Sequence, residues 1–558
     1  MCSEQIGFRK HMRTSDHILT LKTLIDKYFR KNKYIFACFI DLKKAFDTIN
    51  REALLYKLSH YNISGDFFSI LKSMYSNVSF SVNLADGLTN TFESSIGVKQ
   101  GCILSPTLFS LYVNDLSGHF NAECEPLDLN GRHLSCLLYA DDVVLMSESS
   151  KGLQNALNIL KDYCEKWNLE VNIEKTKVII FNKSGKILKN FSFSYGDKVI
   201  QLTNEYKYLG IIFKASGTFS DAIIHLSKKA SKAAFCIWKS LYSDKCNVLV
   251  HLKLFDSCVK PILLYCSELW ALPLLLKGTN LSDFEVNYEK FVPDKIQVKF
   301  AKYLLGVHKS ATNIAVLGEL GLYPLSVSAL KSCVSYWLHV LKATDDKLIF
   351  HAYKDNVLLK NSLFDKLRSF FHIINFGHLW ENQTTFSKKR TLNSISRKLQ
   401  DRYNNFWYSL LFNDNKVSGT NKLRTYREFK NNFKREQFLF ADVDKQNLRN
   451  FIKIRISNCN LNIERGRYMK LPVDQRICQL CNIGVEDEYH FLLDCNKLSH
   501  ERSILFSNIC DIVPSFKNMS RSEQVSFLLS SHDLDICKIN ILGVSNMYQV
   551  NQALKQKL

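Results

Sequence analysis

Two adjacent aspartates, Asp141 and Asp142, lie between the apolar runs CLLY and VVLM. Neighbouring carboxylates repel each other, and burying either one is costly unless it is paired or bound to a metal ion. The pattern therefore predicts a strand, a tight turn that carries the acidic pair, and a second strand. A hydrated hairpin turn would satisfy the same pattern, so the pair alone does not define a metal site.

A third carboxylate, Asp41, ends the run KYIFACFID, which is aromatic and β-branched enough to form a buried strand. Three carboxylates brought together could hold two Mg²⁺ ions roughly 4 Å apart. Such a pair of ions activates a 3′-hydroxyl and stabilises a pyrophosphate leaving group. Spacing in the sequence does not show that the three side chains meet in space.

The hydrophobic pattern predicts a mixed α+β segment followed by a long helical region. The chain is too long for one core, and about three or four domains are expected. Helices predominate from about residue 218 to residue 450. The expected elements before that point are a helix capped by Asn50, a helix opened by Ser64, a hairpin turning at residues 85–87, a helix over residues 153–167, and strands over residues 171–181 and 206–213.

The charge balance indicates a polyanionic partner. Lys and Arg total 74 against 53 Asp and Glu, a formal net charge of +21. That surplus suits nucleic acid or an anionic membrane surface, although a basic protein without such a partner has the same composition. There is no apolar signal segment, and the most apolar run, residues 261–276, contains Glu268 and Pro273. We expect an intracellular protein of the nucleus or cytoplasm, with no membrane partner and an undetermined oligomeric state.

The tract over residues 422–438 interleaves basic and aromatic side chains. Its aromatics either stack on bases or form the inward face of a helix, and their three- and four-residue spacing favours the helix. The basic side chains would then point outward to phosphates. The residues concerned are Lys422, Arg424, Arg427, Lys430, Lys434 and Arg435, with Tyr426, Phe429 and Phe433 as the aromatics.

A Cys/His cluster near the C-terminus has the spacing Cys478-x2-Cys481-x8-His490-x4-Cys495. Without secretion the thiols stay reduced, and four such ligands can close a small tetrahedral Zn²⁺ site. Because the protein fills all four positions, the zinc would be structural. The alternative is a set of reduced core cysteines beside an unrelated histidine.

Five segments resemble, in order, the motifs of the non-LTR (LINE-type) retrotransposon reverse transcriptases. They are FIDLKKAFD, GVKQGCILSPTLFSLYVNDL, YADD, KWNLEVNIEKTKVIIF and YKYLG, all within residues 33–213. QIGFRKHMRTSDHI resembles the stretch before the first motif, and RICQLCNIGVEDEYHFLLDC resembles the family's cysteine-rich knuckle. The resemblance implies an RNA-directed DNA polymerase of a transposable element. Such a nucleotidyltransferase uses Mg²⁺ to add deoxynucleoside triphosphates to a DNA primer on an RNA template.

The resemblance also assigns roles to residues. Asp41 and Asp141 would bridge the metals beside Asp142, Lys175 would donate a proton to pyrophosphate, and Phe46 would favour deoxynucleotides. The remaining assignments are Gln100 and Gly101 at the template and incoming base pair, and Tyr208, Leu209 and Gly210 under the primer end. The alternatives are a core phenylalanine, a solvated lysine and ordinary strand residues.

The implied architecture is an α+β right-hand polymerase. Fingers and palm would occupy residues 1–213, a helical thumb 214–345, a basic helical connector 346–450, and a C-terminal domain 451–558 with its zinc knuckle at 478–495. No Arg-Pro-Ile motif and no endonuclease precede the palm, so we expect a chain truncated at its N-terminus with incomplete fingers. Two other functions stay open: a catalytically inactive remnant that only binds nucleic acid, and a maturase-like protein that supports intron RNA folding.

Overall fold

The computed structural model describes residues 1–240, 248–276, 290–383, 387–412 and 422–557. These residues form two compact units. The first comprises Met1–His225, Cys266–Leu276 and Ser332–Thr385, and the second comprises Leu226–Tyr265, Lys277–Lys331 and Phe386–Leu558.

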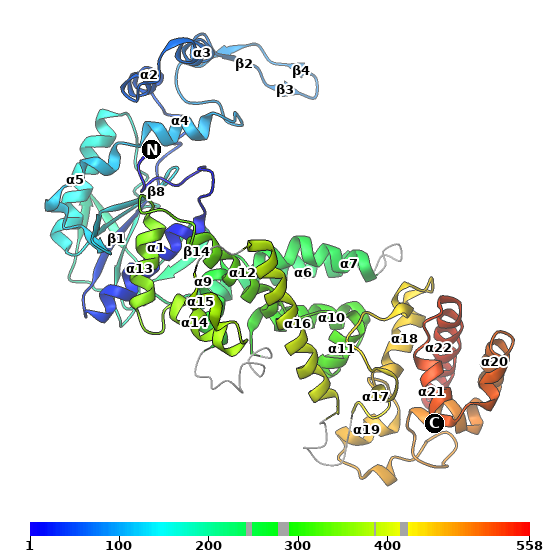
Figure 1. Ribbon diagram of the computed structural model, residues 1–558. Helices are drawn as coiled ribbons and strands as arrows, with labels where there is room; N and C mark the ends of the chain where they lie inside the picture. The colour runs from blue at the N-terminus through cyan, green and yellow to red at the C-terminus, as the bar shows by residue number, and fades with distance from the viewer. Residues whose placement is uncertain (241–247, 277–289, 384–386, 413–421, 558) are drawn as a thin grey trace. The chain divides into compact units, whose positions relative to one another are not determined.

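A six-stranded sheet forms the centre of the first unit (Figure 1). Its strand order is β11 (Phe193–Tyr195), β12 (Lys198–Leu202), β10 (Lys177–Phe181), β1 (Ile35–Ile40), β9 (Asp142–Ser147) and β8 (Cys136–Tyr139). The β10–β12 pair is parallel and the other pairs are antiparallel. All six residues of β1 are buried, which explains why the sequence IFACFI is apolar at every position. The strand predicted to end in Asp41 is therefore confirmed.

Different elements cover the two faces of this sheet. The amphipathic helix α5 (Ser150–Lys166) packs on β1, β9 and β11, and its Leu157 lies in one core with Cys38 and Ile40. Phe39 points to the opposite face because side chains alternate along a strand. There it stacks on Tyr206 of the hairpin β13 (Glu205–Tyr208) and β14 (Ile211–Lys214), with ring centroids 4.7 Å apart.

Residues far along the chain pack onto helix α1 (Thr14–Arg30). Helix α13 (Leu348–Leu358) and strand β6 (Leu127–Leu129) both contact α1. Lys27 Nζ lies 2.6 Å from Asp128 Oδ2 and 2.8 Å from Asp355 Oδ2. These ion pairs hold α13 and β6 to the same side of α1. The first unit also contains β7 (Arg132–Leu134), α9 (Ser267–Leu275), α14 (Leu363–Ile373) and α15 (Gly377–Glu381).

The segment between β1 and β8 contains the predicted helices and hairpin. Asn50 Oδ1 accepts a hydrogen bond from Ala53 N at 3.0 Å, so the predicted cap is confirmed. The hairpin turns after Leu84, which pairs with Gly87, but its ladder consists of two short exposed pieces. The bounds are α2 (Arg51–His60), α3 (Gly65–Tyr75), β2 (Ser79–Phe80), β3 (Asn83–Leu84), β4 (Gly87–Leu88), β5 (Phe92–Glu93) and α4 (Ser105–Tyr112).

The second unit is helical in its described residues, which confirms the helices predicted up to about residue 450 and extends them through the C-terminal part. Helix α16 (Lys388–Phe412) buries every fourth residue from Thr391 to Leu411, which gives it one inward face. Helix α22 (Leu534–Gln556) contacts both α18 (Lys445–Arg455) and α20 (Ser499–Cys510). The other helices are α7 (Val248–Leu254), α8 (Lys260–Leu263), α10 (Val292–Leu305), α11 (Asn313–Leu320), α17 (Tyr426–Phe429), α19 (Asn462–Tyr468) and α21 (Arg521–Leu529), while α6 (Ser220–Ser240) and α12 (Leu325–Val340) have residues in both units.

Shorter helical turns complete the described chain. They are the 3₁₀ turns Leu116–His119, Ala122–Cys124, Gln437–Phe440, Val473–Gln475, Asn496–Leu498 and Pro514–Asn518, and the π turns Phe255–Val259 and His490–Asp494.

The prediction of a helix over residues 422–438 is wrong, because α17 has only four residues. Tyr426 and Phe433 are buried, as the inward-facing interpretation requires. Two of the basic side chains, however, are held inside the unit. Arg424 Nη2 lies 2.6 Å from Glu488 Oε2, and Lys430 pairs with Glu436. Arg424 and Lys430 are therefore paired internally, and the prediction that they point outward to phosphates is wrong.

A buried arginine joins distant parts of the second unit. The side chains of Arg455 and Glu319 are both 0% exposed, and Arg455 Nε lies 2.7 Å from Glu319 Oε2. Arg455 Nη2 lies 2.7 Å from Glu436 Oε2, and Nη1 donates to the carbonyl of Leu529. A buried charge is tolerated when partners of this kind surround it.

No single helix within the described ranges is long and apolar enough to cross a membrane. Two bent helix pairs pass a test of length and composition alone: Val248–Leu263 with Ser267–Leu275, and Asn313–Leu320 with Leu325–Val340.

Candidate active site and metal centre

The predicted acidic residues lie at one end of the sheet. Asp41 directly follows β1, and Asp142 begins the neighbouring strand β9. The antiparallel register pairs Ile40 with Val143, so Asp41 and Asp142 occupy adjoining strand ends. Tyr139 pairs with Asp142, which leaves Ala140 and Asp141 as a two-residue turn. The predicted strand, turn and strand are confirmed.

The N-terminal segment holds this turn in place. Gln5 is fully buried and bridges to Leu138 in parallel, and its Oε1 accepts a hydrogen bond from Ala140 N at 3.0 Å. A Cβ on Gly7 would lie 2.4 Å from Ala140 N, so a side chain there would displace the turn. Ala140 itself has φ +54, a strained value for a residue with a side chain. Nothing in the sequence marks Gln5 apart from its place in the segment that precedes the first motif.

Mutual repulsion and burial act on the carboxylates. Burial raises the pKa of Asp142 to about 6, and the charges of Asp141 and Asp41 add to the shift. Burial and the charge of Asp41 raise the pKa of Asp141 as well. The three residues therefore lie close enough to interact.

Lys175 lies beside the first aspartate. Its Nζ is 3.6 Å from Asp41 Oδ2, although most of the lysine side chain is exposed. The preceding loop is fastened to the same residue, because Asn172 N donates to Asp41 O at 2.7 Å and Asp41 N donates to Thr176 Oγ1 at 3.2 Å. The strand predicted over residues 171–181 is thus wrong in its first half, where these hydrogen bonds hold a loop, and β10 begins only at Lys177.

The residues assigned to the nucleotide lie on a neighbouring loop. Phe46 is half-buried and stacks on Phe109 with ring centroids 4.8 Å apart. This packing agrees with the alternative interpretation of Phe46 as a core phenylalanine. Val98 N donates to Phe46 O at 2.8 Å, and Gln100 Nε2 donates to Asp47 Oδ1 at 2.6 Å. The structure therefore places Phe46 and Gln100 on adjoining segments.

Two glycines of this loop adopt positive φ. Gly97 has φ +79 and faces Asp47 O so closely that a Cβ would lie 2.7 Å away. Gly101 has φ +83 with open space around its missing Cβ. Open space at Gly101 leaves room for a ligand to approach the backbone, whereas Gly97 is required by packing.

Tyr208 ends β13, and Leu209 and Gly210 form the turn of the β13–β14 hairpin. Leu209 and Gly210 both have positive φ, at +45 and +83, as a two-residue turn of this hand requires. Tyr208 is buried, and its hydroxyl lies 3.3 Å from His17 Nδ1. Burial lowers the pKa of His17 to about 3, which keeps the ring neutral near pH 7. The charge of Asp142 raises the pKa of Tyr208 beyond the effect of burial, so this hairpin lies near the aspartates.

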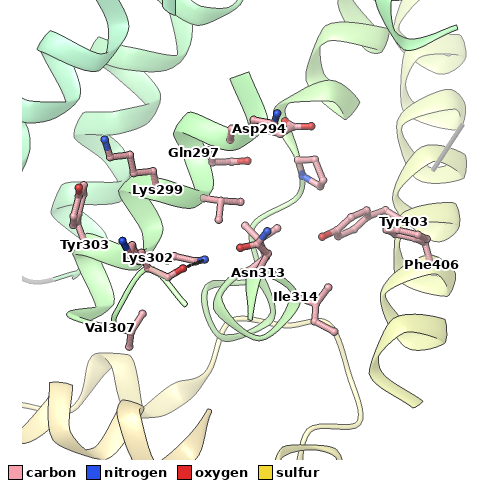
Figure 2. Close-up of a pocket in the computed structure, with 15 residues that line it drawn as sticks. Asp294, Gln297, Lys299, Lys302, Tyr303, Val307, Asn313, Ile314, Tyr403 and Phe406 are labelled. Atoms are coloured by element: carbon pink, nitrogen blue, oxygen red, sulfur yellow. Dashed lines mark hydrogen bonds between the residues drawn. The ribbon is translucent and has the colours of Figure 1, made fainter. Parts of the chain in front are cut away.

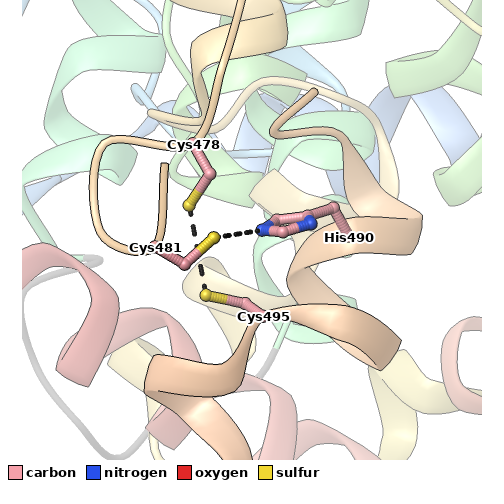
Figure 3. A group of neighbouring side chains, drawn as sticks. All are labelled: Cys478, Cys481, His490 and Cys495. Atoms are coloured by element: carbon pink, nitrogen blue, oxygen red, sulfur yellow. Dashed lines mark hydrogen bonds between the residues drawn. The ribbon is translucent and has the colours of Figure 1, made fainter. Parts of the chain in front are cut away.

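The four predicted cysteine and histidine ligands come together (Figure 3). Cys478 Sγ lies 4.0 Å from Cys495 Sγ, and Cys481 Sγ lies 3.3 Å from His490 Nε2. The hydrogen bond between Cys478 and Cys495 lowers the pKa of Cys478 and raises that of Cys495, and burial adds to the rise at Cys495. Three thiols and one imidazole at this separation could hold a metal ion.

The surrounding backbone fixes this cluster. Ile477 bridges to Val485, and Cys478 N donates to Gly484 O at 3.0 Å, which closes the loop that carries Cys481. Arg502 Nη2 donates to Cys495 O at 2.7 Å. His490 N donates to Asp487 Oδ1 at 2.8 Å. These contacts hold the ligands before any metal is considered.

Three carboxylates at adjoining strand ends of an antiparallel sheet define a candidate site for metal-dependent phosphoryl transfer. Residues 1–213 match the family described as "Reverse transcriptase (RNA-dependent DNA polymerase)". The predicted resemblance of this part of the chain to the reverse transcriptases of non-LTR elements is confirmed by this match and by the names of its relatives.

Curated relatives carry the same kind of name. "RNA-directed DNA polymerase from mobile element jockey" of Drosophila funebris is 27% identical over 276 residues, which are 48% of this chain and 29% of that protein. "Retrovirus-related Pol polyprotein from type-2 retrotransposable element R2DM" of Drosophila melanogaster is 30% identical over 206 residues, 35% of this chain and 19% of that protein. The aligned part of this chain thus spans less than a third of either relative.

Among solved structures, "Structure of apo telomerase from Candida Tropicalis" matches with a TM-score of 0.33 and 14% identity, covering 71% of this chain and 57% of that chain. A likeness this weak supports no conclusion about function.

Proposed function

We propose that this chain is an RNA-directed DNA polymerase of a non-LTR retrotransposon. The observation that carries the proposal is the meeting of Asp41, Asp141 and Asp142 at one sheet edge, within the residues that match the reverse transcriptase family. In this proposal the six-stranded sheet is the palm of a right-hand polymerase. Its substrates are an RNA template, a DNA primer and deoxynucleoside triphosphates.

The three aspartates are the residues that would hold Mg²⁺. Their oxygen atoms suit a hard cation, and a cation would offset the burial and mutual repulsion that raise the pKa values of Asp141 and Asp142. When bound, the metal lowers the cost of forming the attacking 3′-alkoxide and of releasing pyrophosphate. Asp41, Asp141 and Asp142 would supply its carboxylate ligands.

The chain's other side chains would move a proton and position the substrates. Lys175 would protonate the leaving pyrophosphate from its place beside Asp41. Phe46 would exclude a 2′-hydroxyl, and Gln100 with the open backbone at Gly101 would contact the base pair. The turn at Leu209 and Gly210 would support the primer end, anchored through Tyr208 and His17.

The parts beyond the palm are assigned in the same proposal. Residues 214–345 would form the thumb, 346–450 the connector and 451–558 the C-terminal domain. The thumb and connector assignments rest on helical character and basic charge; Ser332–Thr385 pack with the sheet unit, and these boundaries stay a prediction. The four Cys/His ligands would hold one structural Zn²⁺, because their thiol and imidazole donors suit that ion.

Primer extension on an RNA template with deoxynucleotides and Mg²⁺ tests the proposal. Asp141→Asn is expected to lower the extension rate by at least roughly a hundredfold, because it removes a metal ligand from the transition state. Primer–template affinity should stay within a few-fold of the original. Asp197→Asn, which changes an exposed aspartate in the turn between β11 and β12, is the matched control and should extend normally.

Two outcomes would contradict the proposal. Normal extension by Asp141→Asn would refute the metal assignment. Tight template binding without any extension by the unmodified chain would instead support the inactive, nucleic-acid-binding alternative.

A further inference from the structure

The second unit contains a cavity of about 500 Å³ that is lined by residues of the proposed thumb and connector and by none of the residues assigned to catalysis. Helices α10 and α11 and one face of α16 line it (Figure 2). Sites for small organic ligands commonly have volumes of roughly 300–1,000 Å³. The cavity is therefore large enough for one nucleotide-sized ligand.

Part of the wall is aromatic and apolar. Tyr403 and Phe406 lie about one turn apart on α16 and face the cavity across from Lys299 and Lys302 (Figure 2). Tyr303 is 41% exposed, and its ring stacks on Trp238 with centroids 5.1 Å apart. Flat rings that are fixed at a cavity wall can stack on a base of any sequence. The apolar residues between them are Val298, Val307, Ile314, Leu317 and Pro324.

The rim is positively charged. Lys295, Lys299, Lys302 and Lys309 all line the cavity, and the acidic residue among the lining side chains is Asp294. The Asp294 carboxylate is buried and accepts hydrogen bonds from Ser326 N at 3.0 Å and Ser326 Oγ at 2.7 Å, so it faces a protein partner. The net charge at the rim thus favours an anionic ligand.

One lining residue offers a hydrogen-bond acceptor. Gln297 Nε2 donates to Tyr323 O at 3.2 Å, which fixes the amide. Its Oε1 is buried and has no hydrogen-bond partner among the described residues. Buried acceptors are normally satisfied, and the exocyclic amino group of a base is a donor of the required kind.

We propose that this cavity binds one unstacked nucleotide of a single-stranded RNA. The base would lie against Phe406, beside the largely buried Tyr403, and its phosphates would meet Lys299, Lys302 and Lys309. The site is built from residues of the second unit alone, so its occupancy does not depend on extension activity. Binding of RNA by the polymerase palm would be a separate event.

The test compares the affinity of the full chain for a fluorescent 12-nucleotide RNA and for the same strand with abasic riboses, without deoxynucleotides. Stacking is worth enough that the base-containing strand should bind roughly tenfold more tightly. Asn313→Trp fills the cavity from an exposed position at the start of α11 and should remove most of that preference. Asn518→Trp, an equally exposed change in the same unit, should keep it. An undiminished preference in Asn313→Trp overturns the proposal.

If thermal melting shows that Asn313→Trp does not fold, a variant with altered charge at the rim tests the same site. Lys299→Ala with Lys309→Ala should lower the slope of log affinity against log salt by about 1.4, since two phosphate contacts are lost. Lys517→Ala with Lys538→Ala, both exposed in the same unit, is the matched control. An equal slope in the two double variants would contradict the site.

Photo-crosslinking places the ligand directly. A 12-nucleotide RNA that carries 5-iodouridine should form adducts at Tyr403 or Tyr303. If AMP at millimolar concentration competes with the labelled RNA, a free mononucleotide is a sufficient ligand. If the unlabelled strand competes and AMP does not, the site requires an RNA strand. Adducts confined to residues outside the cavity would overturn the proposal.

Discussion

The two candidate metal centres of this chain differ in their electrostatics. The Cys/His cluster brings its four ligand atoms within 4.8 Å of one another, whereas the three aspartates share a sheet edge at which burial and mutual repulsion raise the pKa values of Asp141 and Asp142. The difference follows from charge. In the Cys/His cluster the pKa of one thiol, Cys478, is lowered and those of Cys481 and Cys495 are raised, so a single thiolate lies among neutral thiols, whereas ionised carboxylates repel one another. The fold thus brings the Cys/His ligands together, and we expect a cation to stabilise the aspartates.

Removing a ligand of the Cys/His cluster should have the largest effect on the stability of the fold. Cys481→Ser is expected to lose the single bound zinc and destabilise the C-terminal helices by several kcal/mol, because structural zinc contributes roughly 10–16 kcal/mol in small modules. Metal analysis of the purified chain and thermal melting would measure this. Cys510→Ser, a half-buried thiol outside the cluster, should change neither. A wild-type protein purified without metal, yet fully folded, would sink the assignment.

Removing the lysine beside Asp41 should affect the reaction and leave the fold intact. Lys175→Ala is expected to slow extension by about a hundredfold, the usual contribution of a proton donor. It should also tighten Mg²⁺ binding, because a positive charge 3.6 Å from Asp41 Oδ2 is lost. Single-turnover extension and a Mg²⁺ titration would give both values, with the exposed Lys186→Ala as control. Weaker Mg²⁺ binding, or an unchanged rate, would contradict these roles.

The smallest expected effect is that of removing the repulsion between Asp142 and the other two carboxylates. Asp142→Asn should stabilise the protein without Mg²⁺ by about 1 kcal/mol at pH 7.5, after allowance for solvent screening. The pKa of Asp142 is raised to about 6 from an ordinary value of 3.8, so its ionised form destabilises the fold at neutral pH. The gain should fade as the pH falls from 6 to below 4, where the carboxyl is protonated in both the folded and unfolded states.

Thermal melting of the unmodified chain and Asp142→Asn at pH 7.5 and pH 4 measures this difference, and Asp197→Asn serves as the control. Adding Mg²⁺ should reverse the order of stability at pH 7.5. A gain that is equal at both pH values would show that repulsion is not its cause.

Local patterns in the sequence predicted the elements whose causes are local. The buried strand before Asp41, the two-residue turn at Asp141 and the amphipathic face of α5 each follow from a short run of residues. The Cys/His spacing predicted its cluster for the same reason, since the ligands lie within 18 positions of one another, from Cys478 to Cys495.

Features that depend on distant residues could not be predicted. Gln5 supports a turn 135 positions away, and Tyr208 meets His17 across 191 positions. The loop before Lys177 alternates like a strand, but hydrogen bonds to Asp41 decide its conformation. Arg424 looked like a phosphate ligand because its partners Glu464 and Glu488 lie 40 and 64 residues further along the chain.

The buried pair of Glu319 and Arg455 has a consequence for how the chain matures on the ribosome. The two residues are 136 positions apart, so Glu319 is synthesised long before its counter-ion exists. A lone carboxylate cannot be enclosed cheaply, and α11 should therefore stay open to water until residues beyond 455 have emerged. The second unit is then expected to close late and in one cooperative step, with Arg455 drawing Glu319, Glu436 and the carbonyl of Leu529 together.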